Sequence, residues 1–105
     1  MFKTRKILAT ALLAAGALSA QAQNFEFVAL GDLPYGPAAQ SYPPYRALIE
    51  RINQVAPAFS LHVGDIKSGS TLCSDEEFTN QLEHFQRYAG AVVYTPGDNE
   101  WTDCH

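Results

Sequence analysis

The sequence is poor in basic residues, in cysteine and in repetition. Only 7 of its 105 residues are Lys or Arg, against 11 Asp or Glu, and the formal net charge is −4. Nucleic acid and anionic membrane surfaces bind proteins through clustered positive charge, so neither is an expected partner. The chain contains no internal repeat, low-complexity tract or interdomain linker. One small domain, or the first half of one, is therefore the expected organisation.

Cysteine occurs twice, at Cys73 and Cys104, and never in the paired Cys-x-x-Cys spacing that is typical of zinc sites. Two thiolate metal ligands are therefore the less favoured interpretation. A disulfide between them would close a loop of 30 intervening residues. In the loop-entropy picture such a bond stabilises the fold by about 3–4 kcal/mol, provided that the compartment is oxidising.

The first 22 residues have the three-part pattern of a secretory signal peptide. Three basic residues precede a run of small and apolar residues at 7–18, and Ala20-Gln21-Ala22 supplies a cleavage site after Ala22. The run is too short and too rich in alanine for a membrane anchor, and no cysteine follows it to carry a lipid. We predict a periplasmic or extracellular product, residues 23–105, without a membrane partner after cleavage. It would retain 4 basic and 11 acidic residues, a net charge of −7.

Three apolar runs in residues 23–105 each lead into a glycine followed by an acidic residue. The runs at 25–30, 59–63 and 91–95 lead into Gly31-Asp32, Gly64-Asp65 and Gly97-Asp98-Asn99. Such runs are typical of buried parallel strands. The carboxyl ends of parallel strands meet at one edge of the sheet, where open α/β sheets bind ligands. We call this edge the rim and expect the oxygen-bearing side chains to converge there.

Two helices are predicted between the strands. The first starts at the proline pair Pro43-Pro44, because proline is tolerated at a helix start. The second starts with a capping box, in which Ser74 accepts from a first-turn amide and Glu77 reaches back. The expected buried positions are Leu48, Ile49, Ile52 and Val55 in the first helix and Phe78, Leu82 and Phe85 in the second. This alternation predicts an α/β fold with a mainly parallel sheet built from βαβαβ units.

Converging oxygen ligands at one rim would repel one another unless a cation lies between them. Hard divalent or trivalent ions are the natural partners of such ligands, and Asp65, in the middle position, could bridge two of them. A single Gly-Asp is an ordinary turn dipeptide. Three of them at strand ends are much less expected by chance, so the sequence predicts a metal centre.

At these motifs the chain resembles the calcineurin-like metallophosphoesterases, the superfamily that includes the purple acid phosphatases. The family's first blocks are Asp-x-His, Gly-Asp with a short loop, and Gly-Asn-His-(Glu/Asp). Here they stand as Gly31-Asp32-Leu33-Pro34-Tyr35, Gly64-Asp65-Ile66-Lys67 and Gly97-Asp98-Asn99-Glu100. The resemblance implies the N-terminal half of a four-layer αββα sandwich. It also implies a secreted phosphoesterase that hydrolyses small phosphate esters by a metal-bound hydroxide, with two metal ions (Fe, Zn or Mn).

The resemblance further implies roles for individual residues. Asp32 would bind the first metal, Asp65 would bridge both, and Asp98 would bind the second. Asn99 would stand in the place of the histidine that contacts the phosphate, where its amide could hydrogen-bond an oxygen but not donate a proton as imidazolium does. A shift by one residue, which would make Asn99 the metal ligand, is equally compatible with the sequence.

The chain departs from the family at its histidines. Pro34 replaces the histidine of the first block, and Tyr35 beside it is a candidate phenolate ligand. The family's later histidine blocks do not occur before the sequence ends at His105. The alternative function is therefore a secreted, non-catalytic module that holds a cation or an oxyanion, or an inactive fragment of a longer enzyme.

Some residues near the motifs have both a functional and a structural interpretation. Lys67 is a candidate for binding the phosphate, and an ordinary solvent-facing charge is the competing interpretation. His62 lies within the second apolar run and is expected to be a core histidine rather than a ligand. His84 is expected to be a packing or solvated residue, and Trp101 is expected to cover the core rather than to stack on a substrate.

Overall fold

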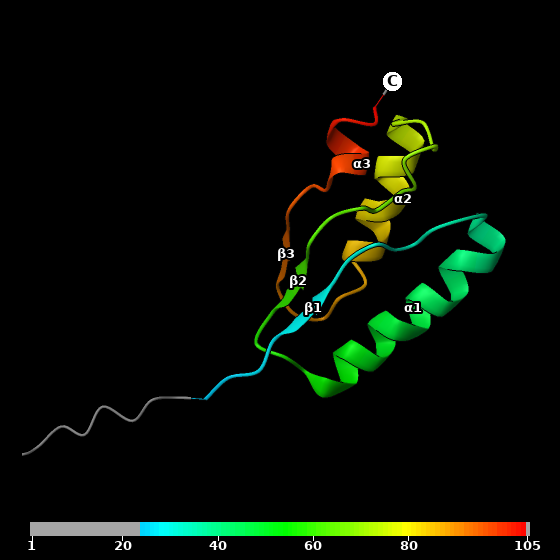
Figure 1. Ribbon diagram of the computed structural model, residues 1–105. Helices are drawn as coiled ribbons and strands as arrows, with labels where there is room; N and C mark the ends of the chain where they lie inside the picture. The colour runs from blue at the N-terminus through cyan, green and yellow to red at the C-terminus, as the bar shows by residue number, and fades with distance from the viewer. Residues whose placement is uncertain (1–23, 105) are drawn as a thin grey trace, which may run out of the picture.

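The computed structural model describes residues 24–104. The predicted signal peptide at 1–22 and the terminal His105 lie outside the described residues. The elements follow the order β1 (Val28–Leu30), α1 (Ala38–Val55), β2 (Ser60–His62), α2 (Asp75–Phe85), β3 (Val92–Tyr94) and α3 (Asp98–Trp101) (Figure 1). The predicted alternation of strands and helices is confirmed, with the short α3 added. None of the helices in this part of the chain is long and apolar enough to cross a membrane.

The three strands form one parallel sheet in the order β1-β2-β3. Val28 is opposite Ser60, and Ser60 is opposite Val92, so the strands start and end at the same level. Side chains of both long helices pack against the face of the sheet that carries Val28, Leu30 and Val92. The described residues therefore form an α/β unit with one parallel sheet and helices on one side.

The core lies between this face of the sheet and α1. Tyr45, Ile49 and Ile52 are buried there together with Tyr88, which follows α2. The predicted stripe on α1 is correct for Ile49 and Ile52 but wrong for Leu48 and Val55, which are exposed. The helix turns Tyr45, four residues before Ile49, toward the sheet, because positions i, i+4 and i+7 share one helix face.

The start of α1 also differs from the prediction, because Pro43 and Pro44 lie inside the helix. A proline within a helix leaves the carbonyl four residues before it without its backbone donor. Here those carbonyls belong to Ala39 and Gln40, which are exposed and can be hydrated. In the first turn Ser41 Oγ makes hydrogen bonds with the carbonyl oxygens of Gly36 (3.2 Å) and Pro37 (3.1 Å). The helix therefore tolerates both prolines one turn after its start.

α2 begins as predicted but buries a different face. Ser74 Oγ accepts a hydrogen bond from Glu77 N (3.2 Å), as predicted. The Ser74 amide donates to Leu72 O (3.1 Å) rather than to the Glu77 side chain. Gln81 and His84 are buried, whereas Leu82 is 54% exposed. The predicted buried face of α2 is therefore wrong for Leu82 and for Phe78, which is 39% exposed, whereas Phe85 packs against the core.

Packing against α1 explains this orientation of α2. Gln81 Nε2 donates to Tyr45 OH (3.0 Å), and the rings of His84 and Tyr45 are 5.0 Å apart. Phe78 and Leu82 instead line an apolar groove beside β3 and α3 together with Trp101, which is 77% exposed. The expectation that Trp101 covers the core is wrong, because α3 lies past the end of β3, at the margin of the sheet (Figure 1).

The face of the sheet opposite the helices is apolar and has no cover within residues 24–104. By strand alternation it carries Phe27, Leu61, Val63 and Val93. Phe27, Val63 and Val93 are each about half exposed, at 51%, 50% and 47%. The second sheet of the predicted sandwich is not part of the described chain.

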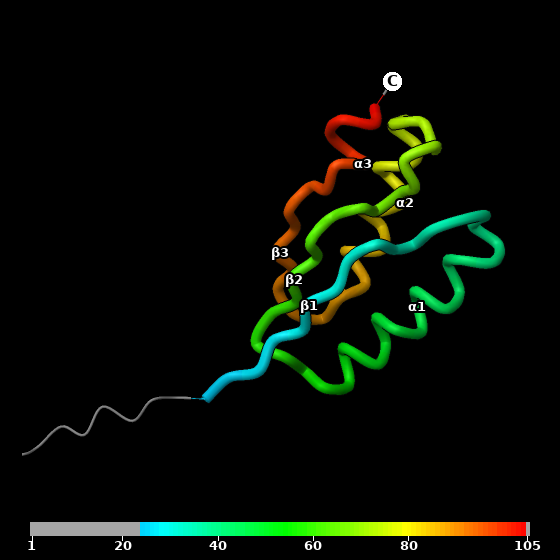
Figure 2. Tube along the Cα trace, in the orientation of Figure 1, coloured from blue at the N-terminus to red at the C-terminus, as the bar shows by residue number. Residues whose placement is uncertain are grey.

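Cys73 and Cys104 form the predicted disulfide, with their Cα atoms 5.2 Å apart. The bond joins the loop before α2 to the segment after α3, two segments that lie side by side (Figure 2). No cysteine remains free, so the interpretation of these residues as thiolate metal ligands is wrong.

Candidate functional site

The rim is built by the loops after β1 and β2 and by the turn from β3 into α3. Asp32 N donates to Gly64 O (3.1 Å) and joins the first two loops, and Thr95 N donates to His62 O (3.0 Å) and joins β3 to β2. Because the parallel strands end at one level, the three predicted motifs lie together at the carboxyl edge of the sheet (Figure 1).

Asp32 and Asp65 share an uncommon backbone conformation. Their φ angles are 61° and 55°, in the left-handed region that residues with a Cβ rarely adopt. Each follows a glycine at the end of a strand, and Gly64 itself has a φ of 98°. Such conformations cost about 1–3 kcal/mol each and are concentrated at functional sites. The rim therefore holds both aspartates in conformations that the fold must stabilise.

Gly64 and Gly97 allow the second and third loops to approach closely. A Cβ at Gly64 would collide with the backbone nitrogen of Gly97, and a Cβ at Gly97 would collide with Asp65 Oδ1. Asn99 N also donates to Asp65 Oδ1 (3.3 Å). The Asp65 carboxylate therefore lies directly over the turn that leads into α3.

Asn99 is the residue of the third motif that joins Asp65 and Tyr35. Its Nδ2 group donates to Tyr35 OH (2.8 Å) and to Lys67 O (3.0 Å), whereas Oδ1 lies beside Gly69 and accepts no hydrogen bond from residues 24–104. Asp98 is exposed at the start of α3, where its backbone carbonyl accepts from Thr102. Of the two candidates in this motif, the fold brings Asn99 into contact with Asp65 and Tyr35, whereas the side chain of Asp98 is exposed.

The phenol of Tyr35 lies at the rim as a neutral group. Partial burial, followed by the negative charges of Asp65 and Asp32, raises the pKa of Tyr35 to about 12. The same two charges that disfavour the phenolate would be neutralised by a cation. Tyr35 therefore contributes a neutral hydroxyl to the rim at neutral pH.

Lys67 contributes its backbone to the rim and its side chain to a neighbouring pocket. The residue is 1% exposed, and Nζ donates to Ser68 O (3.3 Å). A polar pocket of about 290 Å³ adjoins this side chain and is lined also by Pro34, Tyr42, Thr71 and Glu77. The interpretation of Lys67 as a solvent-facing charge is wrong, because the loop after β2 folds over its side chain.

Glu100 is a buried rim residue to which sequence reasoning assigned no role. Its Oε2 accepts from Asp65 N (3.1 Å), and its Oε1 accepts from Ile66 N (2.7 Å) and Tyr94 OH (3.0 Å). The only sequence signal was its place as the last residue of the third motif, Gly97-Asp98-Asn99-Glu100. Nothing in the local pattern shows that this carboxylate bonds to the backbone of the second motif.

His62 is a core histidine, as expected, and its ring makes hydrogen bonds with the loops after β1 and β2. Its Nδ1 accepts from Gly64 N (3.2 Å), and its Nε2 donates to Leu33 O (3.3 Å). The side chain is fully buried, and this burial lowers the pKa of His62 below its usual value of about 6.5. Both nitrogens are therefore satisfied only in the neutral ring.

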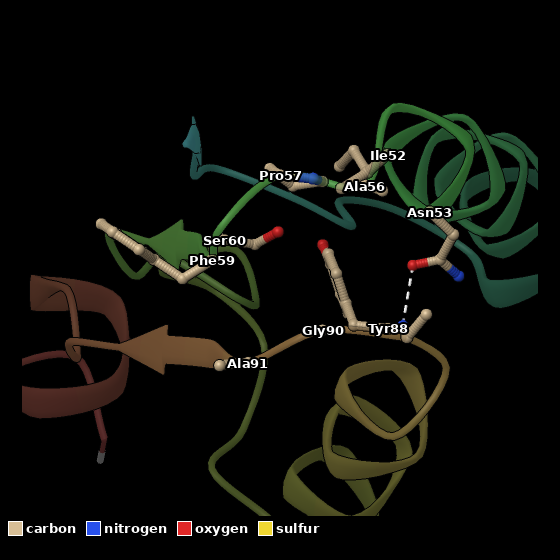
Figure 3. A pocket seen from close by; sticks show the side chains of 10 residues that line it. Ile52, Asn53, Ala56, Pro57, Phe59, Ser60, Tyr88, Gly90 and Ala91 are labelled. Atoms are coloured by element: carbon tan, nitrogen blue, oxygen red, sulfur yellow. Dashed lines mark hydrogen bonds between the residues drawn. The ribbon is translucent and has the colours of Figure 1, made fainter. Parts of the chain in front are cut away.

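A second cavity, of about 160 Å³, lies at the opposite end of the strands (Figure 3). Its wall is mainly apolar, with Pro57, Phe59 and Tyr88 among its residues, and the nearby Asn53 Oδ1 accepts from Ala89 N (2.8 Å). None of the predicted site residues lines this cavity. This cavity is therefore separate from the rim.

The predicted site residues at the rim offer oxygen atoms rather than nitrogen or sulfur atoms as donors. The carboxylates of Asp32 and Asp65 and the free Oδ1 of Asn99 are oxygen ligands of the kind that Mg²⁺, Mn²⁺ and Ca²⁺ prefer. Residues 24–104 contain no group of three or more His, Cys, Asp and Glu side chains placed to hold a metal ion. His62 and His84 are both buried in the core. The described chain therefore offers a partial ligand set without histidine.

Comparisons of the chain with protein-family models, with curated proteins and with solved structures find no match. Each of the three predicted motifs ends one of three adjacent parallel strands.

Proposed function

We propose that this chain belongs to a secreted phosphoesterase that requires a divalent or trivalent metal ion and acts on small phosphate esters. The observation that carries the proposal is the pair of aspartates, Asp32 and Asp65, held in left-handed backbone conformations at the ends of adjacent parallel strands. A structure that maintains two such conformations at one rim must stabilise them elsewhere, which favours a functional reason for them. The disulfide supports the oxidising compartment in which the proposal places the protein.

In this proposal Asp32, Asp65 and Asn99 hold the cation. When bound, the metal would lower the pKa of a coordinated water and neutralise charge on the phosphoryl oxygens. Tyr35 presents a hydroxyl beside these ligands, and both donor hydrogens of the Asn99 amide are already used within the protein. Asn99 thus acts through Oδ1 as a ligand, and Tyr35 is the group left to orient a phosphate oxygen.

The apolar, uncovered face of the sheet supports the finer expectation of a four-layer sandwich. Phe27, Val63 and Val93 leave about half of their surface exposed on that face. Parallel sheets are rarely exposed on one side, because their strands are apolar on both faces. We propose that this face packs against a second sheet in the functional protein.

A secreted cation-binding module without catalysis is the second candidate. Both described histidines lie in the core rather than at the rim, so the site has no imidazole to protonate a leaving group. This candidate predicts stoichiometric cation binding without turnover.

One pair of measurements separates these candidates. Calorimetric titration with Mn²⁺ of the purified, oxidised protein should show binding that Asp65→Asn weakens at least about 10-fold, because it removes a charged ligand. Glu50→Gln, an exposed change on α1, is the matched control and should leave Mn²⁺ affinity unchanged. Turnover of a chromogenic phosphate monoester or diester, lost in Asp65→Asn, would support the enzyme. Binding without turnover would support the module, and absence of both would contradict the proposal.

A further inference from the structure

We infer that Glu100 is a positioning residue that holds the backbone of Asp65 and Ile66, so that the Asp65 carboxylate points to the rim. The inference rests on the proposed function, because it assigns Glu100 a part in building the cation site. Glu100 does not itself present an atom to the rim in this role.

The first support is the number of hydrogen bonds that the Glu100 carboxylate accepts. Asp65 N, Ile66 N and Tyr94 OH donate to it at 3.1, 2.7 and 3.0 Å. Glu100 is 8% exposed, and a buried carboxylate is stable only when its oxygens are bonded in this way. The group is therefore committed to the loop after β2 and is not a free ligand.

The second support is the backbone that these hydrogen bonds stabilise. Gly64 and Asp65 have consecutive positive φ angles of 98° and 55°. The amides of Asp65 and Ile66 lie at this left-handed turn, and both donate to the Glu100 carboxylate. Within residues 24–104 no backbone carbonyl accepts from Asp65 N or Ile66 N. The left-handed turn therefore depends on a side chain that lies 35 residues beyond Asp65 and 34 residues beyond Ile66.

The third support is that the same carboxylate connects two motifs of the rim. Glu100 lies in α3 directly after Asn99, whose backbone amide donates to Asp65 Oδ1 (3.3 Å). The third motif thus contacts the side chain of Asp65 through Asn99 and its main chain through Glu100. A change in Glu100 would alter the direction of the Asp65 carboxylate without removing any rim ligand.

Glu100→Gln tests this inference, because glutamine keeps the size of the side chain but has one acceptor oxygen and one NH₂ donor. The NH₂ group would face the amide of Asp65 or of Ile66, and two donors cannot bond to each other. We expect the dissociation constant for Mn²⁺ to rise by about 10- to 100-fold, as when supporting residues of other metal sites are changed. In the metal-free protein, amide hydrogen exchange at Asp65 and Ile66 should accelerate by about 10-fold or more, with little change at the core amides of α1.

Two further variants separate positioning from general stability. Ile49→Val removes one methyl group from the core and should lower the unfolding midpoint while leaving Mn²⁺ affinity unchanged. Tyr94→Phe removes only one donor to Glu100 Oε1 and should weaken Mn²⁺ binding by a smaller, few-fold factor. If Glu100→Gln does not fold, Tyr94→Phe carries the test through the same two measurements.

Different results would overturn the positioning role of Glu100 and the proposed function. Unchanged exchange at Asp65 and Ile66 and unchanged Mn²⁺ affinity in Glu100→Gln, with a wild type that binds Mn²⁺, would overturn the positioning role alone. A wild type that binds no Mn²⁺ would overturn the proposed function. In that case the exchange measurement still decides whether Glu100 holds the Asp65 backbone.

Discussion

At the scale of single residues, the rim depends on glycines, because its loops approach each other too closely for a side chain. Gly97 has an ordinary backbone conformation, yet a Cβ at this position would collide with Asp65 Oδ1 and would approach Asp65 N to 2.6 Å. The Asp65 carboxylate and the turn into α3 therefore fit together only because Gly97 has no side chain. The sequence marks the Gly-Asp of the third motif as the end of a strand. It does not show that this glycine must lack a side chain, because that requirement comes from the contact between two loops.

Gly97→Ala is expected to lower the free energy of unfolding by about 1–3 kcal/mol and to weaken Mn²⁺ binding, because the methyl group would displace Asp65. Urea denaturation and calorimetric titration measure the two effects. Gly90→Ala is the matched control, since a Cβ at Gly90 would meet only Pro57 O at 3.7 Å, an ordinary contact. Equal stability and equal affinity of the two alanine variants would contradict the close approach described here.

His62 makes stability depend on pH. Burial lowers the pKa of His62 in the folded protein below the value near 6.5 that it has in the unfolded chain. Between those two values the unfolded chain binds more protons, so the free energy of unfolding should fall as the pH falls through 6.5. Burial also lowers the pKa of His84, so both histidines contribute in the same direction. Each contributes up to about 1.4 kcal/mol per pH unit.

Urea unfolding between pH 8 and pH 5.5 measures this slope in a range above the ordinary pKa values of carboxylates, which are near 4. His62→Gln should be less stable at pH 8, because Gly64 N and Leu33 O lose well-placed partners, and it should show a shallower fall toward pH 5.5. A slope as steep as that of the wild type would show that His62 is not held neutral by the fold.

At the scale of elements, the strands are shorter than their apolar runs. Each strand has 3 residues, whereas the apolar runs in the sequence are longer. The order of elements could be predicted, because each run ends at Gly and each helix has an apolar periodicity. The orientation of α2 could not be predicted, because no local signal shows which side chains of α1 it will contact. The side chains that α2 buries are Gln81 and His84, because both contact Tyr45 of α1.

A matched pair of substitutions tests this orientation. Ile49→Ala should cost about 2–5 kcal/mol of unfolding free energy, because it leaves a cavity at a position that is 1% exposed. Leu82→Ala should cost about 1 kcal/mol or less, because Leu82 is more than half exposed. Chemical denaturation of both variants supplies the comparison. A cost at Leu82 equal to that at Ile49 would mean that the apolar stripe predicted from sequence is buried after all.

At the scale of the whole molecule, the described chain has one small core and one long-range covalent link. The core is limited to Tyr45, Ile49, Ile52 and Tyr88 with their partly buried neighbours. A core of this size gives little margin of stability, and small secreted domains often depend on disulfides for that reason. The bond between Cys73 and Cys104 also brings the end of α3, and with it Asn99 and Glu100, toward the loop before α2.

Reduction of the disulfide is expected to lower the free energy of unfolding by about 3–4 kcal/mol, because the bond closes a loop over a sequence separation of 31. Denaturation with and without dithiothreitol measures the difference. The double variant Cys73→Ser with Cys104→Ser should match the reduced wild type and should not respond to dithiothreitol. An oxidised and a reduced protein of equal stability would contradict this role of the bond.

The sequence by itself determined the order of elements, the parallel sheet, the shared rim and the disulfide. These follow from local signals: apolar runs that end in glycine, helical periodicity, and two cysteines in a chain with a predicted signal peptide. The tertiary structure alone decided which residues meet. It brought Asn99 rather than Asp98 to Asp65, buried Lys67, and placed Glu100 on the Asp65 backbone. Such contacts join residues more than 30 positions apart, and only the packing of loops across strand ends determines them.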